Sequence, residues 1–314
     1  MRVLLPGWWS DEITKSRAGQ KELLVLLARR LNLNLVSLLS NAAQASFADS
    51  HRRFKTRRGK SDEQLLVASG IAQGLAASLQ RASRAKWAGI PNDPLRLHET
   101  IVDSYGQVDL GSLALYCWNV GIAVVHVENW PRGVRRPDAV CVRHEGRPVI
   151  LVVRAETAAS KLLFYLAHEI GHIALGHISG EEALIDDEVN REAQNAPVTD
   201  AEERAADDFA LQLIRGADDI SYPKRVGSEL ELVVWAQTES KRTCVDAGHL
   251  ILSWGELRQD WAAANTALRY LEQSSPAPKR LNDIAQTQVD FENLADDALD
   301  HLQVLTGICE PSHS

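Results

Sequence analysis

The stretch LFYLAHEIGHIA, residues 163–174, combines a helical pattern with the motif His-Glu-x-x-His. Its apolar residues recur at spacings of three and four and predict an amphipathic helix over residues 157–176; they are Leu163, Leu166, Ala167, Ile170 and Ala174. Residues four apart are neighbours on one helix face, so we expect His168 and His172 to bind one zinc ion together. Glu169 then lies beside the metal and can accept a proton from a bound water.

A small residue inside this helix predicts a close neighbour. Glycine costs about 1 kcal/mol relative to alanine in a helix interior, so we expect another element to approach the helix at Gly171. The bare pentapeptide also arises by chance, as two partly buried histidines beside an incidental glutamate. Its place in an apolar helix that follows a pair of predicted strands favours a metal site.

A catalytic zinc site needs a third protein ligand and an open position. A second helix, predicted over residues 200–215, offers Glu202 and Glu203 near the edges of its apolar stripe, so helical geometry leaves both open as this ligand. Asp207 follows one turn after Glu203 and can hydrogen-bond a zinc-bound histidine. Alternatively, these acids only stabilise the start of the helix.

Two other histidines are candidates for the site. His177 follows His172 by five residues, one fewer than in the longer zinc motif, so we expect it to be a donor at the helix C-terminus rather than a ligand. His249 either reaches the site as a hydrogen-bond donor to the transition state or is an ordinary loop or core histidine, which is our expectation.

The combined pattern resembles the ImmA/IrrE family of zinc metallopeptidases, which carry H-E-[LI]-G-H, a variable loop and then E-x-x-A-[ND]-x-F-A. Residues 168–172 read H-E-I-G-H and residues 203–210 read E-R-A-A-D-D-F-A. The resemblance covers roughly residues 95–215 and implies a gluzincin-like protease fold. It makes Glu203 the third ligand and Asp207 the acid bonded to a zinc-bound histidine. It also implies cleavage of a regulator, by a protease often joined to a DNA-binding domain.

These patterns predict an α+β protein that is mostly helical. The resemblance implies that its core is a minimal zincin-like metallopeptidase unit, a three-stranded sheet plus the His-Glu-x-x-His helix, which helical N- and C-terminal regions flank. The three strands are expected at 122–127, 139–142 and 149–153, and a further short strand at 230–236. Breaks in the pattern divide the chain into three regions. Residues 1–90 form a basic helical region, which fits a helix-turn-helix or a plain helical hairpin. Residues 95–220 form a metallopeptidase domain, and residues 221–314 form a mainly helical C-terminal region.

The charge is unevenly distributed along the 314 residues, whose net charge is −8. Residues 1–100 hold 16 Lys and Arg against eight Asp and Glu, and the remainder holds 18 against 34. A cluster of basic residues in the first part predicts electrostatic contact with nucleic acid, or else a solvated loop; it consists of Arg52, Arg53, Lys55, Arg57 and Arg58. The acidic stretch 178–199 is expected to be an irregular, solvated surface.

Composition indicates where such a protein would work. No apolar run reaches the roughly 18 residues of a membrane span, and the first residues lack a signal-peptide pattern. The four cysteines have no paired spacing, which argues against a disulfide scaffold or a four-cysteine zinc site. We therefore expect a cytoplasmic protein.

The leading hypothesis is a zinc endopeptidase that cleaves a specific regulatory protein, a repressor or antitoxin, in stress or mobile-element control. The substrate would bind in extended form along an edge strand. The alternative is a DNA-binding transcriptional regulator or antitoxin whose metal domain serves as a sensor or a partner-binding surface. The basic cluster favours the alternative, and the intact Glu169 favours the enzyme.

Overall fold

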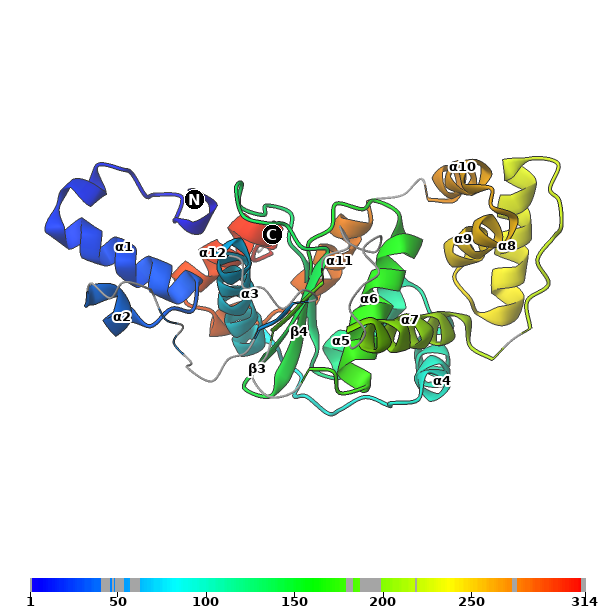
Figure 1. Ribbon diagram of the computed structural model, residues 1–314, viewed down its shortest axis with the longest axis horizontal. Helices are drawn as coiled ribbons and strands as arrows, with labels where there is room; N and C mark the ends of the chain where they lie inside the picture. The colour runs from blue at the N-terminus through cyan, green and yellow to red at the C-terminus, as the bar shows by residue number, and fades with distance from the viewer. Residues whose placement is uncertain are drawn as a thin grey trace.

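A mixed β-sheet lies in the middle of an elongated molecule (Figure 1). The computed structural model describes residues 2–40, 46, 48, 54–56, 63–178, 183–186, 199–217, 219–272 and 276–311. The helices are α1 (Arg17–Arg30), α2 (Leu35–Leu39), α3 (Glu63–Ala82), α4 (Pro94–Tyr105), α5 (Leu110–Asn119), α6 (Ala159–Ala174), α7 (Thr199–Arg215), α8 (Glu229–Thr243), α9 (Ala247–Arg258), α10 (Trp261–Leu271), α11 (Ala277–Gln288) and α12 (Asp296–Thr306). The predicted α+β class, mostly helical, is confirmed.

The strand order in the sheet is β1-β5-β3-β4-β2. The strands are β1 (Phe54–Thr56), β2 (Ala123–His126), β3 (Ala139–His144), β4 (Arg147–Val152) and β5 (Ala183–Asp186). β3 and β4 form an antiparallel hairpin, β5 is antiparallel to β3, and the outer strands β2 and β1 run parallel to β4 and β5. Glu145 and Gly146 both have positive φ, as a two-residue hairpin turn requires.

Two features of the predicted strands need correction. The three predicted strands are β2, β3 and β4, but the sheet has five, because β1 and β5 add to the β3 side. β5 lies inside the acidic stretch that was expected to be irregular. The strand predicted at 230–236 is wrong: these residues belong to α8, whose start is capped by the Ser228 side chain and whose buried residues follow helical spacing.

Three stretches predicted as continuous helix from the apolar pattern are each interrupted and form two helices. The interval 95–119 shows why: Gly106, in the left-handed conformation, ends α4, and a capping box between Asp109 and Ser112 starts α5. The predicted intervals 16–39 and 279–306 likewise contain two α-helices each, and the helices predicted around 245–272 are α9 and α10.

The sheet separates two apolar cores because its side chains alternate between its faces. Val124 and Ile150 face the core that contains α5, α6 and α7. Val125 and Leu151 face the core that contains α3 and α12. In Figure 1 these two groups of helices lie on opposite sides of the sheet.

The C-terminal part of the chain supports both the sheet and α6. Asn282 of α11 accepts from His126 N–H at 2.8 Å and donates to His126 C=O at 2.9 Å, which covers the outer edge of β2. Glu272, just after α10, accepts from the N–H groups of Ala159 at 2.7 Å and Ser160 at 3.2 Å. Because Ala158 offers no side-chain cap, this carboxylate satisfies the first turn of α6.

No helix within the described ranges is both long enough and apolar enough for a membrane span. The predicted domain limits stay predictions.

The carboxyl group of Asp246 gives the fold a testable pH dependence. Its side chain caps α9, and burial raises its pKa to about 7, with the Glu272 and Asp109 carboxylates adding to the effect. Because this pKa exceeds the unfolded value of roughly 3.9, stability is lost as the pH rises from about 4 to about 7.

We expect Asp246→Asn, which keeps a capping oxygen but carries no charge, to unfold at higher urea concentration than the wild type at pH 8. The two proteins should differ little at pH 3.5. Urea unfolding at both pH values measures this, and an equal difference at both would contradict the assigned cause.

Candidate metal centre

Helices α6 and α7 meet at Gly171. A Cβ atom at this position would lie 3.1 Å from the Ala206 carbonyl oxygen and 3.3 Å from Phe209 Cβ. These distances leave little room for any side chain between the helices, so the predicted close approach at Gly171 is confirmed. The contact holds the first half of α7 against the His-Glu-x-x-His turn of α6 (Figure 1).

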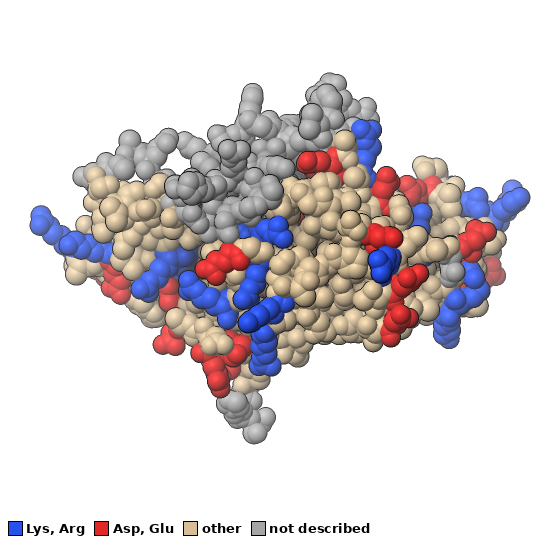
Figure 2. All heavy atoms as spheres, turned by 90° about the horizontal axis from the view of Figure 1, so that it is seen from below, with Lys and Arg blue, Asp and Glu red and all other residues tan. Residues whose placement is uncertain are grey.

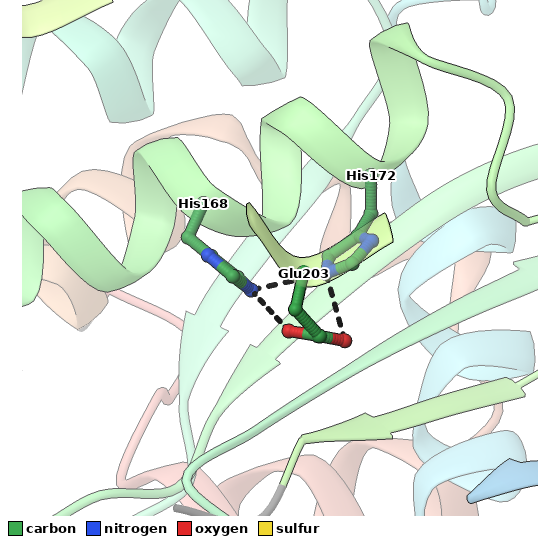
Figure 3. Close-up of side chains that lie close together, drawn as sticks. All are labelled: His168, His172 and Glu203. Atoms are coloured by element: carbon green, nitrogen blue, oxygen red, sulfur yellow. Dashed lines mark hydrogen bonds and ion pairs between the residues drawn. The ribbon is translucent and has the colours of Figure 1, made fainter. Parts of the chain in front are cut away.

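Three side chains converge at this crossing, as Figure 3 shows. The Nε2 atoms of His168 and His172 lie 3.0 Å apart. Glu203 places Oε2 3.2 Å from His168 Nε2 and Oε1 3.6 Å from His172 Nε2. Both histidine side chains are buried, at 2% and 1% exposure, whereas Glu203 is 17% exposed. The cluster is therefore anchored in the core on one side and reaches solvent through Glu203.

These separations fit a coordinated metal ion. Ligand atoms roughly 2.0–2.1 Å from a tetrahedral zinc lie about 3.3 Å from one another. The observed separations of 3.0, 3.2 and 3.6 Å bracket that value. Among the described residues, His168, His172 and Glu203 are the group of three whose ligand atoms all lie within 4.8 Å of one another.

The hydrogen bond to Asp207 fixes how His168 presents its ring. Its Nδ1 lies 2.8 Å from Asp207 Oδ1. Since a carboxylate accepts, we assign the proton to Nδ1, which leaves a lone pair on Nε2. This lone pair faces the Glu203 carboxylate. Two acceptors that face each other repel unless a proton or a metal cation lies between them, so these three groups suit a metal ion.

Glu169 lies on α6 beside the cluster, 1% exposed, and it is not one of the three convergent groups. Its carboxylate lies near Cys141 of β3: burial raises the pKa of this thiol well above its usual value, and the charge of Glu169 raises it further. Glu169 is thus held between α6 and the sheet, next to the ligands.

Two further candidate residues, Glu202 and His249, are not part of the convergent group. Glu203 belongs to the convergent group of described residues and Glu202 does not, which favours Glu203 as the third ligand. His249 is buried in α9, where it accepts from Arg215 Nε at 3.2 Å and lies 3.4 Å from Ser253 Oγ. Burial, aided by Arg215, lowers the pKa of His249 to about 3. It is a core histidine, as expected.

The predicted nucleic-acid contact cannot be placed. Four of its residues, Arg52, Arg53, Arg57 and Arg58, lie outside the described residues, and so does the Lys55 side chain, although its backbone belongs to β1. Most of the acidic stretch 178–199 also lies outside them. Contact with DNA therefore stays a prediction.

Two contacts near the site were not predicted. The ring of His177 lies against His172, with their Nδ1 atoms 2.9 Å apart. Glu272 caps the helix that carries both histidine ligands. A glycine directly before His177 was the available signal for the first contact. The second joins residues more than 100 positions apart, which no local pattern reveals.

Comparison with known proteins supports a peptidase. Residues 113–249 match the family model Peptidase U49. The matched segment runs from α5 into α9 and includes α6 and α7, so it contains all three convergent residues, His168, His172 and Glu203. It spans 137 of the 314 residues. No curated protein matches the chain.

The helix crossing predicts the effect of filling Gly171. In Gly171→Val the new side chain must push α7 away, and overpacking of this kind typically costs about 1–3 kcal/mol. We expect this loss in urea unfolding, together with weaker metal binding because α7 carries Glu203. Gly111→Val, in α5, is the matched control, since its Cβ meets only the Asp109 carboxylate, at 3.4 Å. A Gly171→Val protein as stable as the wild type would contradict the tight crossing.

The cluster predicts about one zinc per chain. The double variant His168→Ala with His172→Ala should lose this zinc because both nitrogen ligands are gone. Glu203→Gln should retain far less zinc than Glu202→Gln, which changes the neighbouring glutamate on the same helix. Elemental analysis after dialysis against a weak chelator measures the content. Greater loss in Glu202→Gln would reassign the third ligand.

Proposed function

We propose that this protein is a zinc-dependent endopeptidase that cleaves a specific regulatory protein, a repressor or antitoxin. The observation that carries the proposal is the convergence of His168, His172 and Glu203 beside Glu169, within a segment that matches a peptidase family. The regulatory class of the substrate comes from the resemblance to the ImmA/IrrE family.

The ligands and the base have separate tasks. His168, His172 and Glu203 would hold the ion, and Asp207 fixes the ring of His168 through the 2.8 Å hydrogen bond. A bound zinc ion supplies Lewis acidity at the reaction centre. Glu169 accepts the proton of the attacking water and delivers it to the amine that leaves the scissile bond. Its burial keeps the carboxylate in one place between α6 and the sheet.

The sheet limits where an extended substrate can bind. Asn282 covers the outer edge of β2, and β1 pairs with the outer edge of β5. β5 joins β3, the strand whose Cys141 lies near Glu169. A peptide that pairs directly with β5 would take the place that residues 54–56 hold.

Glu169→Gln separates an enzyme from a metal-bearing regulator. The amide keeps the shape of the side chain but cannot take a proton, and general-base catalysis is typically worth about 10²–10⁴-fold. We expect cleavage to fall by this factor while the zinc content stays that of the wild type. The assay co-expresses the chain with the product of a neighbouring gene and follows the partner's mass. Glu202→Gln is the control and should cleave normally.

The contrary outcome is that the wild type leaves its partner uncleaved and that the wild type and Glu169→Gln control repression equally. The metal site would then be structural or sensory. The zinc prediction would survive that result, and the endopeptidase would not.

A further inference from the structure

The chain just after α6 brings a third histidine ring, that of His177, to the cluster of His168, His172 and Glu203. Gly176 has φ +73° and turns the chain after the last residues of the helix. His177 N–H donates to His172 C=O at 3.0 Å, and Gly176 N–H donates to Ile173 C=O at 3.3 Å. These two hydrogen bonds form a Schellman motif. The backbone thus returns His177 to the side of His172, five residues earlier.

The two rings are in direct contact. His172 Nδ1 lies 2.9 Å from His177 Nδ1, and the ring planes are inclined at 64° with centroids 5.1 Å apart. His172 Nε2 faces the other members of the cluster, 3.0 Å from His168 Nε2. To offer a lone pair to a metal there, His172 must carry its proton on Nδ1. That proton is then donated to Nδ1 of His177.

We infer that His177 is a positioning residue of the metal centre, whose ring accepts from His172 and holds it in the orientation and tautomer that bind zinc. The inference rests on the zinc peptidase proposed above and assigns no ligand role to His177. Its Nδ1 is engaged by His172, and the ring is not among the convergent ligand groups of the described residues.

The two histidine ligands then have partners of different kinds. His168 donates to a carboxylate, that of Asp207, and His172 donates to an imidazole. Both partners orient a ring, but only the carboxylate adds negative charge to the site. Partners of this kind typically change metal affinity by about 10- to 100-fold when they are removed.

The test measures zinc affinity by competition with a chromophoric chelator. His177→Leu keeps apolar volume but offers no acceptor, and we expect about 10- to 100-fold weaker binding. His177→Asn places an oxygen near the position of Nδ1 and should restore most of the affinity. His98→Leu is the control: it removes a histidine whose Nδ1 bonds Leu213 C=O at the other end of α7, so zinc affinity should not change.

A second measurement distinguishes positioning from a merely structural role. The absorption spectrum of bound Co²⁺ reports ligand geometry, so it should change in His177→Leu and return in His177→Asn. The melting temperature of the metal-free proteins should stay that of the wild type.

Wild-type affinity in His177→Leu would overturn the inference and leave the proposed peptidase intact. Complete loss of zinc in both His177→Leu and His177→Asn would also overturn it, because His177 would then act as a ligand. A wild type that binds no zinc at all would instead refute the metal centre itself, and the proposed function with it.

Discussion

The contact between α6 and α7 at Gly171 is the constraint on which the metal centre depends. The two imidazoles of the cluster lie on α6 and its carboxylate lies on α7, so the three groups meet only where the helices nearly touch. A Cβ at Gly171 would lie 3.1 Å from the α7 backbone. The absence of one side chain thus permits three others to meet. Glu272 and the apolar face toward the sheet hold α6 in place for that contact.

Metal binding at the cluster of His168, His172 and Glu203 would be coupled to folding. Buried acceptors without a proton or a cation between them are costly, and here two imidazole nitrogens and a carboxylate face one another within 3.0–3.6 Å. A bound cation removes that repulsion, so part of its binding energy becomes stability of the fold. Asp207 and His177 contribute on the outer side, where each engages the Nδ1 atom of one ligand ring. Each imidazole is therefore engaged at both nitrogens: Nε2 lies in the cluster, and Nδ1 contacts Asp207 or His177.

Local pattern predicted the parts of the fold that local physics determines. Short β-branched apolar runs bounded by turn residues located β2, β3 and β4, and the apolar stripe located α6 with both of its histidines. The strands β1 and β5 escaped prediction because three or four residues in charged surroundings form no such run. The run 230–236 is apolar enough for a strand, but the Ser228 cap and burial of one face make it a helix. Helical spacing could not distinguish Glu203 from Glu202, although the family resemblance favoured Glu203, because tertiary packing decides how α7 rotates against α6.

The most direct test of the central claim is X-ray absorption at the zinc edge of the zinc-loaded, full-length protein. The account predicts a first shell of nitrogen and oxygen at roughly 2.0–2.1 Å, with the multiple-scattering pattern of two imidazoles and no sulfur. The buried thiol of Cys141 on β3 lies near Glu169 and is a sulfur donor that the account leaves outside the first shell. A sulfur shell near 2.3 Å, or a pattern without two imidazoles, would contradict a centre made of His168, His172 and Glu203.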